Sequence, residues 1–237
     1  MSPLGEDLFA SAAAAAHACE PSRDCGLCPR LAGFRAENRS AHPDWFNAPV
    51  PTFGSHEAWL LIVGLAPGLR GANRTGRPFT GDFAGLLLYE TLLSLGLASG
   101  VYAERADDGL RLIGCAITNA VRCVPPQNKP QPSEIATCRA FLEATIAALP
   151  NLRTIVALGR VAHDSVLRAF GQKLAALPFA HGAEHGLAHA ARGITLFDSY
   201  HCSRYNTNTA VLTPAMFRDV FERAAKLAPH GFRARNS

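Results

Sequence analysis

Cysteine is the residue type of this chain best suited to metal chemistry, and four of its seven cysteines stand out by position. Cys25 and Cys28 form a CxxC pair, whose thiolates can reach one metal centre from a tight turn. Cys123 begins a proline-rich loop, and Cys138 lies in the helix expected after it. Four thiolates suit a tetrahedral zinc ion or a cubane iron–sulfur cluster. Because a zinc ribbon usually carries two CxxC pairs, the spacing favours the iron–sulfur cluster.

A second group of reactive side chains begins where an apolar segment gives way to glycine and arginine. Residues 64–82 contain five glycines together with Arg70, Arg74 and Arg77. Glycine lets backbone amides approach a ligand closely, and the arginines indicate an anionic ligand. The segment matches neither the Walker pattern nor GxGxxG, so it is not one of these two nucleotide loops. The alternative is an ordinary connection between a strand and a helix.

Two other apolar segments also end in polar side chains. Residues 112–121 are apolar until Asn119 near their end, and residues 194–200 lead into His201 and Asn206. The carboxyl ends of parallel strands share one edge of the sheet, where ligand sites form, so we expect these side chains to converge on the glycine-rich segment. Such a set can bind the edge of a base and stabilise a leaving group that carries negative charge. The alternative for Asn119 is that it caps a turn.

The elements that must position these residues alternate between strand and helix patterns. This order predicts a single α/β domain over residues 1–237 with a parallel sheet, a core at 19–225 and a loose basic tail at 228–237. The expected strands are 59–64, 112–121, 152–158 and 194–200. The expected helices are 5–20, 83–95, one capped by Ser133, 161–170 and 214–227. The remaining long segments are predicted to be a loop at 33–57 and a surface excursion at 171–193.

Composition limits the classes of protein that fit. The formal net charge of +4 is compatible with a polyanionic partner. No run of eighteen apolar residues exists, so we expect no transmembrane helix. The alanine-rich start follows Glu6 and Asp7 rather than basic residues, which excludes a signal peptide and favours an intracellular protein. In that compartment seven cysteines indicate metal or redox chemistry rather than a disulfide framework.

Three long motifs and the four thiols together resemble the uracil-DNA glycosylase superfamily, most closely its fifth family, the iron–sulfur type-5 enzymes of bacteria and archaea. The motifs are GLAPGLRGANRTGRPFTGD at 64–82, TNAVRCVPPQNKP at 118–130 and HCSRYNTNTAVLTP at 201–214. The resemblance implies a three-layer α/β/α sandwich around a four-stranded parallel sheet. It also implies a structural [4Fe–4S] cluster on Cys25, Cys28, Cys123 and Cys138 and the excision of uracil from DNA, with other deaminated bases such as hypoxanthine as further substrates.

The resemblance also implies a role for particular residues around a nucleotide flipped out of the DNA stack. The turn from Gly64 to Gly68 is expected to lie against that nucleotide, and Phe79 is expected to stack on its base. Asn119 is expected to read the pyrimidine edge, and His201 is expected to support negative charge on the departing base.

Four more residues complete the implied substrate site. Leu65 and Ala66, within the turn, form a roomy wall, and this favours a broad range of bases. Arg204 and the other arginines are candidates for phosphate contacts, while Asn206 and the loop after it resemble the element that enters the DNA minor groove.

One departure from the superfamily pattern concerns the residue that handles water. Other families place Asp, Asn or Glu directly after the glycine that ends the first strand, where this chain has Leu65. Asp82 is the only acid in the motif and becomes the candidate carboxylate that orients water or stabilises a cation. A helix cap before Phe83 is the alternative role for Asp82. Without a strong base, we expect a dissociative route in which the glycosidic bond breaks early and donors stabilise the base anion.

Two other functions are compatible with parts of the chain. An iron–sulfur redox protein that binds a nucleotide would use the thiols but would leave Asn119 and His201 without a role. A DNA-binding module without catalysis, holding the base covalently, would need a nucleophilic histidine near the glycine-rich segment, and residues 68–82 contain none. We therefore expect a monomeric glycosylase of the prokaryotic cytoplasm that works at the nucleoid on DNA containing uracil.

Overall fold

A central six-stranded sheet organises the computed structural model, which describes residues 20–189 and 192–229. The strand order is β1-β5-β2-β6-β8-β7. The four middle strands run parallel, as predicted, and the two edge strands pair antiparallel to their neighbours. The middle strands are β5 (Cys115–Asn119), β2 (Leu60–Gly64), β6 (Thr154–Leu158) and β8 (Arg192–Ser199), and the edges are β1 (Phe53–Gly54) and β7 (Glu184–His189).

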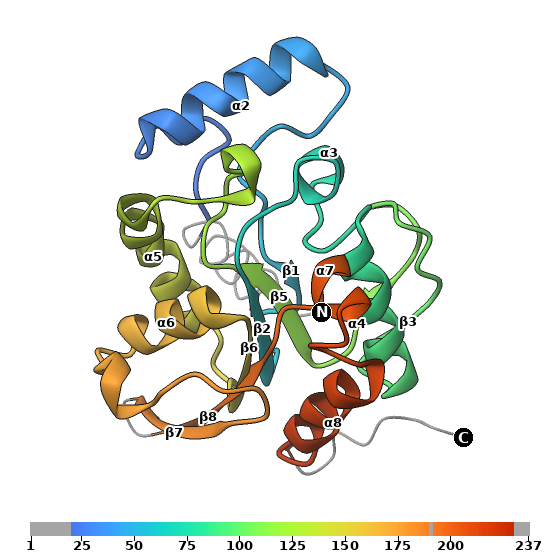
Figure 1. The fold of residues 1–237 in the computed structure, drawn as a ribbon, viewed down its shortest axis with the longest axis vertical. Coiled ribbons are helices and arrows are strands. Elements are labelled where there is room, and N and C mark those ends of the chain that lie inside the picture. Colours follow the sequence, from blue (N-terminus) through green and yellow to red (C-terminus); the bar gives the residue numbers. More distant parts are fainter. Residues whose placement is uncertain (1–19, 190–191, 230–237) are drawn as a thin grey trace, which may run out of the picture.

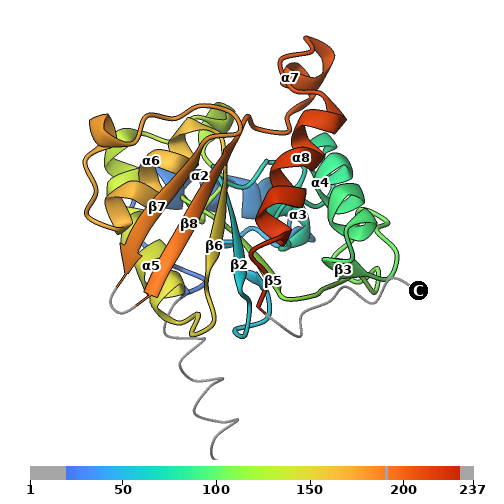
Figure 2. The same cartoon turned by 90° about the horizontal axis from the view of Figure 1, so that it is seen from below.

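Helices cover both faces of this sheet, so the fold is a three-layer α/β/α sandwich (Figures 1 and 2). Helices α5 (Pro132–Ala147) and α6 (Arg160–Ala169) lie on one face, and α4 (Phe83–Ser94) and α8 (Pro214–Ala225) lie on the other. Every residue of β2, β5 and β6 is buried, because a parallel sheet covered on both faces offers no side to water. Alternate strand residues therefore enter two separate cores.

Three short elements surround the carboxyl edge of the sheet. They are α3 (Ala72–Thr75) in the glycine-rich segment, the 3-10 helix η1 (Pro126–Asn128) and helix α7 (Arg204–Asn208). Gly64 pairs with Asn119 across β2 and β5, which places the ends of these two strands at the same level. The glycine-rich segment and the loop after β5 therefore leave the sheet side by side.

The prediction of a loop at residues 33–57 is wrong for its first part, because α2 (Pro29–Ala41) occupies it. The sequence lacks the apolar periodicity of an amphipathic helix here, because two of the three buried residues of α2, Arg35 and Asn38, are polar. It begins directly after Cys28, with Pro29 in its first turn. The metal-binding candidate CxxC is thus held at a helix start.

The predicted surface excursion at 171–193 is also wrong in part. A short 3-10 helix, η2 (Leu174–Ala176), is followed by β7, which forms a hairpin with β8 and closes that side of the sheet. Within it, the side chain of His185 is buried against Asp198 of β8.

The connection between α4 and β5 contains a small two-stranded sheet of β3 (Ala98–Ser99) and β4 (Arg111–Leu112). The cap of α5 also differs from the prediction: Gln131, not Ser133, precedes the helix, and it forms a capping box with Glu134. The cap predicted at Thr213 for α8 is confirmed, since its hydroxyl accepts the amide of Met216.

The predicted N-terminal helix at 5–20 and Cys19 lie outside the described residues, as does most of the predicted basic tail. No helix among the described residues is long and apolar enough to cross a membrane.

Candidate active site

A cavity of about 350 Å³ opens at the carboxyl edge of the sheet, which is a size typical of small-ligand sites. Its wall comes from the ends of β2, β5 and β8, as the sequence pattern indicated. The lining residues singled out from the sequence are Leu65, Ala66, Gly68, Phe79, Asp82, Asn119, His201 and Arg204. The structure therefore places most of the candidate site residues around one space, and their individual roles remain predictions.

Gly64 brings two of these residues together although it does not itself line the cavity. A Cβ at this position would overlap the side-chain oxygen of Asn119 and the ring of Phe79. The absence of a side chain at the end of β2 thus allows the amide and the aromatic ring to lie next to each other. The ring of Phe79 also stacks towards His201, with 6.0 Å between ring centroids and 28° between planes.

Asp82 is confirmed as the cap of α4 and also lines the cavity, while its catalytic role stays a prediction. Its Oδ1 accepts the amide of Gly85 and caps α4, while the residue also lines the cavity. Oδ2 faces the turn between Gly68 and Gly71, where a Cβ would lie 3.0 Å and 2.5 Å from it. Burial raises the pKa of this carboxyl above its usual range, against the lowering effect of its backbone hydrogen bonds. The two glycines make the space that this carboxylate occupies.

His201 follows β8 and is held by a residue with a different expected role. The side-chain amide of Asn206 donates to the carbonyl oxygen of His201 over 2.8 Å. Burial lowers the pKa of His201 to about 4, so the imidazole is neutral at physiological pH. A neutral imidazole can still donate one N–H to an oxygen that gains negative charge. Asn206 does not line the cavity and instead fixes the backbone that carries His201.

The arginines of the glycine-rich segment divide into two kinds. Arg70 and Arg74 are at or near the surface, and the Nε of Arg74 donates to the carbonyl oxygen of Arg70. Arg77 is buried and forms a bidentate ion pair with Asp108. The expectation that Arg77 belongs to a phosphate cradle is therefore wrong, because its guanidinium is already neutralised by the protein. Arg204 lines the cavity with its guanidinium 5.3 Å from the ring of Phe83.

Sequence reasoning missed three polar or aromatic residues that line the cavity: Phe83, Asn128 and Ser203. Asn128 ends η1 with a positive φ of 56°. Asparagine tolerates this left-handed backbone better than most residues, and this was the available signal. Ser203 caps α7 by accepting the amide of Asn206.

The four thiols singled out from the sequence lie together at a second, much smaller cavity of about 20 Å³. Cys25 and Cys28 reach it from the start of α2, Cys123 from the loop after β5 and Cys138 from α5. Among the described residues, no three of these sulfur atoms lie within 4.8 Å of one another.

Two of the four thiols, Cys123 and Cys138, are buried, and the other two are half-buried. Burial raises the pKa of Cys123 to about 12 and that of Cys138 to about 11, so both remain protonated unless a cation is bound. N–H donors already point at these sulfurs: Arg35 at Cys123 over 3.4 Å, and the amide of Arg122 at Cys138 over 3.3 Å. Hydrogen bonds of this kind stabilise and tune metal-bound thiolates. The donor set therefore fits a multi-thiolate centre.

A third buried cluster lies beside β8 and consists of His163, His185 and Asp198. Nε2 of His163 lies 2.9 Å from the carbonyl oxygen of Leu177 and donates to it, while Nδ1 lies 2.7 Å from Oδ1 of Asp198. Nε2 of His185 lies 3.0 Å from the other carboxylate oxygen. Although burial alone would lower the pKa of His163, its hydrogen bond to Asp198 raises it. The cluster thus ties α6 and β7 to the strand that carries His201.

Comparison with known families identifies the same region of the chain. A family model described as "Uracil DNA glycosylase superfamily" matches residues 51–225, which contain the sheet and all the cavity residues.

Individual relatives match over most of their length. A protein of Thermus thermophilus named "Type-5 uracil-DNA glycosylase" is 47% identical over 210 residues, which cover 86% of this chain and 94% of the relative. A protein of Mycobacterium leprae with the same name is 44% identical and covers 86% of this chain and 91% of the relative. A protein of Archaeoglobus fulgidus named "Type-4 uracil-DNA glycosylase" is 31% identical over 73% of this chain and 76% of the relative.

Proposed function

The chain belongs to the uracil DNA glycosylase superfamily, and from that premise we propose that it removes uracil from DNA by hydrolysing the N-glycosidic bond. The observation that supports the proposal is that Asn119 and Phe79 lie against Gly64, with His201 stacked towards the same ring of Phe79. An amide, an aromatic face and a neutral imidazole together suit a flat pyrimidine with polar edges. A base inside a duplex cannot reach this cavity, so the nucleotide must be flipped out.

In the proposed mechanism Phe79 stacks on the flipped base and Asn119 hydrogen-bonds to its edge. As the glycosidic bond breaks, negative charge builds up on the base. The neutral imidazole of His201 donates an N–H to that charge, an interaction that strengthens only in the transition state. The hydrogen bond from Asn206 to the His201 carbonyl keeps the donor in place.

Asp82 is proposed to act on the sugar side of the bond. One oxygen is committed to the cap of α4, and the other lies in the space left by Gly68 and Gly71. A carboxylate held there can orient a water molecule and stabilise positive charge on the sugar. Because burial raises the pKa of Asp82, activity should fall on the acid side at a pH above the range of an ordinary aspartate.

DNA is proposed to approach over the edge where α7 projects beyond the rest of the sandwich (Figure 2). Tyr205 on this helix is 74% exposed, and Arg204 beside it reaches the cavity. An exposed aromatic next to a cation suits insertion into the minor groove and contact with the backbone. Binding should therefore weaken steeply with salt.

The four thiols are proposed to hold a [4Fe–4S] cluster with a structural role. When bound, the cluster supplies the positive charge that lets buried thiolates form and joins the start of α2 to α5 and the loop after β5. It lies outside the wall of the larger cavity, so the residues around the base do the chemistry.

We extend the proposal to other deaminated bases such as hypoxanthine, since the wall formed by Leu65 and Ala66 lacks bulky polar groups. We also propose that the chain acts as a monomer and as a single domain on chromosomal DNA at the nucleoid.

The experiment compares excision and binding in matched variants. A uracil-containing oligonucleotide is incubated with the protein, treated with alkali and examined for cleavage. Asn119→Ala and His201→Ala should each lower the single-turnover rate by about 10²- to 10³-fold while DNA affinity changes little. The controls are Asn151→Ala and His56→Ala, exposed residues of the same types. Wild-type rates in both cavity variants would show that the site is wrongly assigned.

A further inference from the structure

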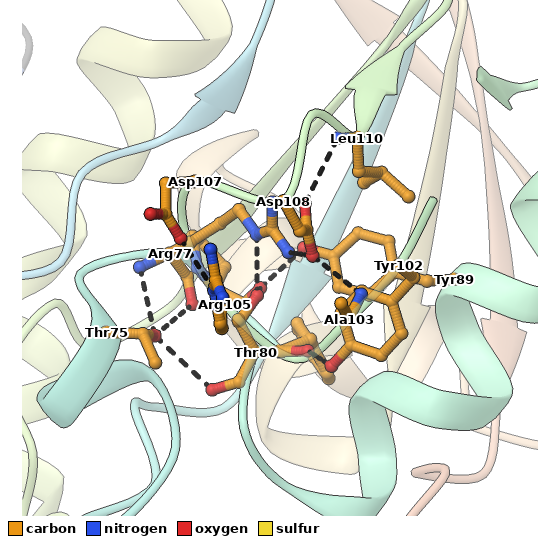
Figure 3. A network of polar contacts seen from close by, with 12 residues as sticks. Thr75, Arg77, Thr80, Tyr89, Tyr102, Ala103, Arg105, Asp107, Asp108 and Leu110 are labelled. Atoms are coloured by element: carbon orange, nitrogen blue, oxygen red, sulfur yellow. Dashed lines mark hydrogen bonds and ion pairs between the residues drawn. The ribbon is translucent and has the colours of Figure 1, made fainter. Parts of the chain in front are cut away.

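The connection between α4 and β5 contributes no residue to the cavity wall, yet it carries a buried carboxylate. The side chain of Asp108 is 1% exposed, and its carboxylate accepts hydrogen bonds from both terminal guanidinium nitrogens of Arg77, over 2.8 Å and 2.7 Å. The backbone amides of Ala103 and Leu110 donate to the same carboxylate, which fixes its orientation (Figure 3). A buried ion pair is costly unless its polar atoms are hydrogen-bonded, and here each guanidinium nitrogen and each carboxylate oxygen has a partner.

Aromatic rings enclose the guanidinium of Arg77. Its Cζ lies 5.3 Å from the ring centroid of Phe53, 5.4 Å from that of Tyr89 and 5.7 Å from that of Tyr102. Cation–π contacts at these distances are attractive. We call Arg77, Asp108, Tyr89 and Tyr102 the guanidinium cage. It joins the glycine-rich segment, α4 and the connection after α4 into one unit.

The cage reaches the cavity through backbone carbonyls. The hydroxyl of Tyr102 donates to the carbonyl oxygen of Phe79 over 3.1 Å, and that of Tyr89 donates to the carbonyl oxygen of Pro78 over 2.6 Å. Burial raises the pKa of Tyr102 to about 12, so its hydroxyl stays protonated as a donor. The Nε of Arg77 holds the next residue, Thr80, through its hydroxyl over 2.7 Å.

Phe79 needs such support because of its backbone. Its φ is 52°, in the left-handed region that bulky residues rarely adopt and that persists only when the surroundings impose it. On the other side its carbonyl is packed so closely against α4 that a Cβ at Gly85 would overlap it. This backbone turns the ring towards Asn119 and His201.

We propose that the guanidinium cage is a positioning unit that fixes the Phe79 ring in its stacking position before DNA binds, so that Asp108 and Tyr102 control recognition of the flipped base without touching it. The proposal rests on the proposed function only in assigning the base as the partner of the ring. A stacked ring contacts the base equally in the ground state and in the transition state. Loosening it should therefore raise KM and leave kcat nearly unchanged.

The kinetic test uses Tyr102→Phe, which removes one hydroxyl, and Asp108→Asn, which removes the charge of the pair. With a uracil oligonucleotide, each variant should raise KM roughly three- to tenfold, which corresponds to losing part of the free energy of a base–aromatic stack. The kcat of each variant should stay within about twofold of wild type. Asp107→Asn is the matched control, since this neighbouring aspartate is 78% exposed and pairs only with Arg105 at the surface. Both variants are repeated in a Phe79→Leu background, where they should change KM no further.

The second measurement is independent of activity. Hydrogen exchange of the amides of 79–82 should become faster in Asp108→Asn and Tyr102→Phe but not in Asp107→Asn, while exchange at 119–122 stays unchanged. The proposal is overturned if exchange at 79–82 is unaffected, if KM does not move, or if the KM effect persists without the Phe79 ring. A different outcome would overturn the proposed function instead. If exchange at 79–82 is faster in the cage variants but the wild-type protein does not excise uracil, the structural role of the cage stands.

Discussion

The thiol corner (Cys25, Cys28, Cys123 and Cys138) and the guanidinium cage both join segments that are distant in sequence. They differ in where their balancing charge comes from. The cage contains its own cation and anion, which pair with each other and with neighbouring groups of the chain. The thiol corner contains four donors of one kind, whose ionised forms would repel one another without a bound cation.

This difference distinguishes two ways of holding the segments around a cavity in place. The cage is complete once the chain has folded. With the proposed cluster, the thiol corner would be complete only once the cell supplies the metal, so its contribution to stability would be linked to that supply. Each of these two kinds of support can be broken separately.

The largest effect is expected from breaking the thiol corner. Cys123→Ser should abolish iron binding and the broad absorbance near about 400 nm that iron–sulfur proteins show. Loss of a structural metal is among the few changes that cost more than about 4 kcal/mol, which for a chain of this size lowers Tm by roughly 10 °C or more. Iron analysis, absorbance and thermal unfolding measure this.

The matched control for that prediction is Cys115→Ala. Cys115 is a buried thiol of β5 that donates to the carbonyl of Leu97 and lies outside the corner. It should keep its iron and absorbance. A colourless wild-type protein that contains zinc would contradict the proposed cluster.

A smaller effect is expected from removing the charge of the cage. Asp108→Asn should cost about 3 kcal/mol at neutral pH, because it leaves the buried Arg77 without a counter-ion. The hydrogen bonds from Arg77 hold the pKa of Asp108 well below its usual range. The stabilisation is therefore present above about pH 4, the usual range of aspartate, and is lost as the pH falls further. Urea unfolding of both proteins between pH 7 and pH 2 should show their difference shrinking; a constant difference would contradict this assignment.

The smallest effect concerns the pair of His163 and Asp198. Like the cage it contains its own cation, but the positive charge of that cation depends on pH. Because the pKa of His163 is raised in the folded state, its stabilisation is complete below about pH 6.5 and is lost as the pH rises through the folded value. The groups around it are Asp198, His185 and Asp164. Tm measured from pH 6 to pH 9 should fall by a few degrees more in wild type than in His163→Gln. Parallel profiles would show that His163 is neutral.

The sequence by itself determined the four parallel strands, because their apolar runs are bounded and alternate with helix patterns. The convergence of Gly64, Asn119 and His201 followed from the same order, since the carboxyl ends of parallel strands share an edge. The gathering of the four thiols could also be anticipated from the chemistry of cysteine in an intracellular chain. These features are local in the chain or follow from topology alone.

Only the tertiary structure decided which polar groups are buried and paired with other groups of the protein. Nothing in the sequence distinguishes Arg77 from Arg70 and Arg74, yet Arg77 alone of the three is buried against a carboxylate 31 positions away. Helix α2 was missed because it buries polar residues, and β7 because its partner strand supplies the contacts that its own pattern lacks. The double role of Asp82 likewise depends on two glycines brought against it by folding. Pairing and burial are properties of the folded chain, and residue type and spacing specify them only in part.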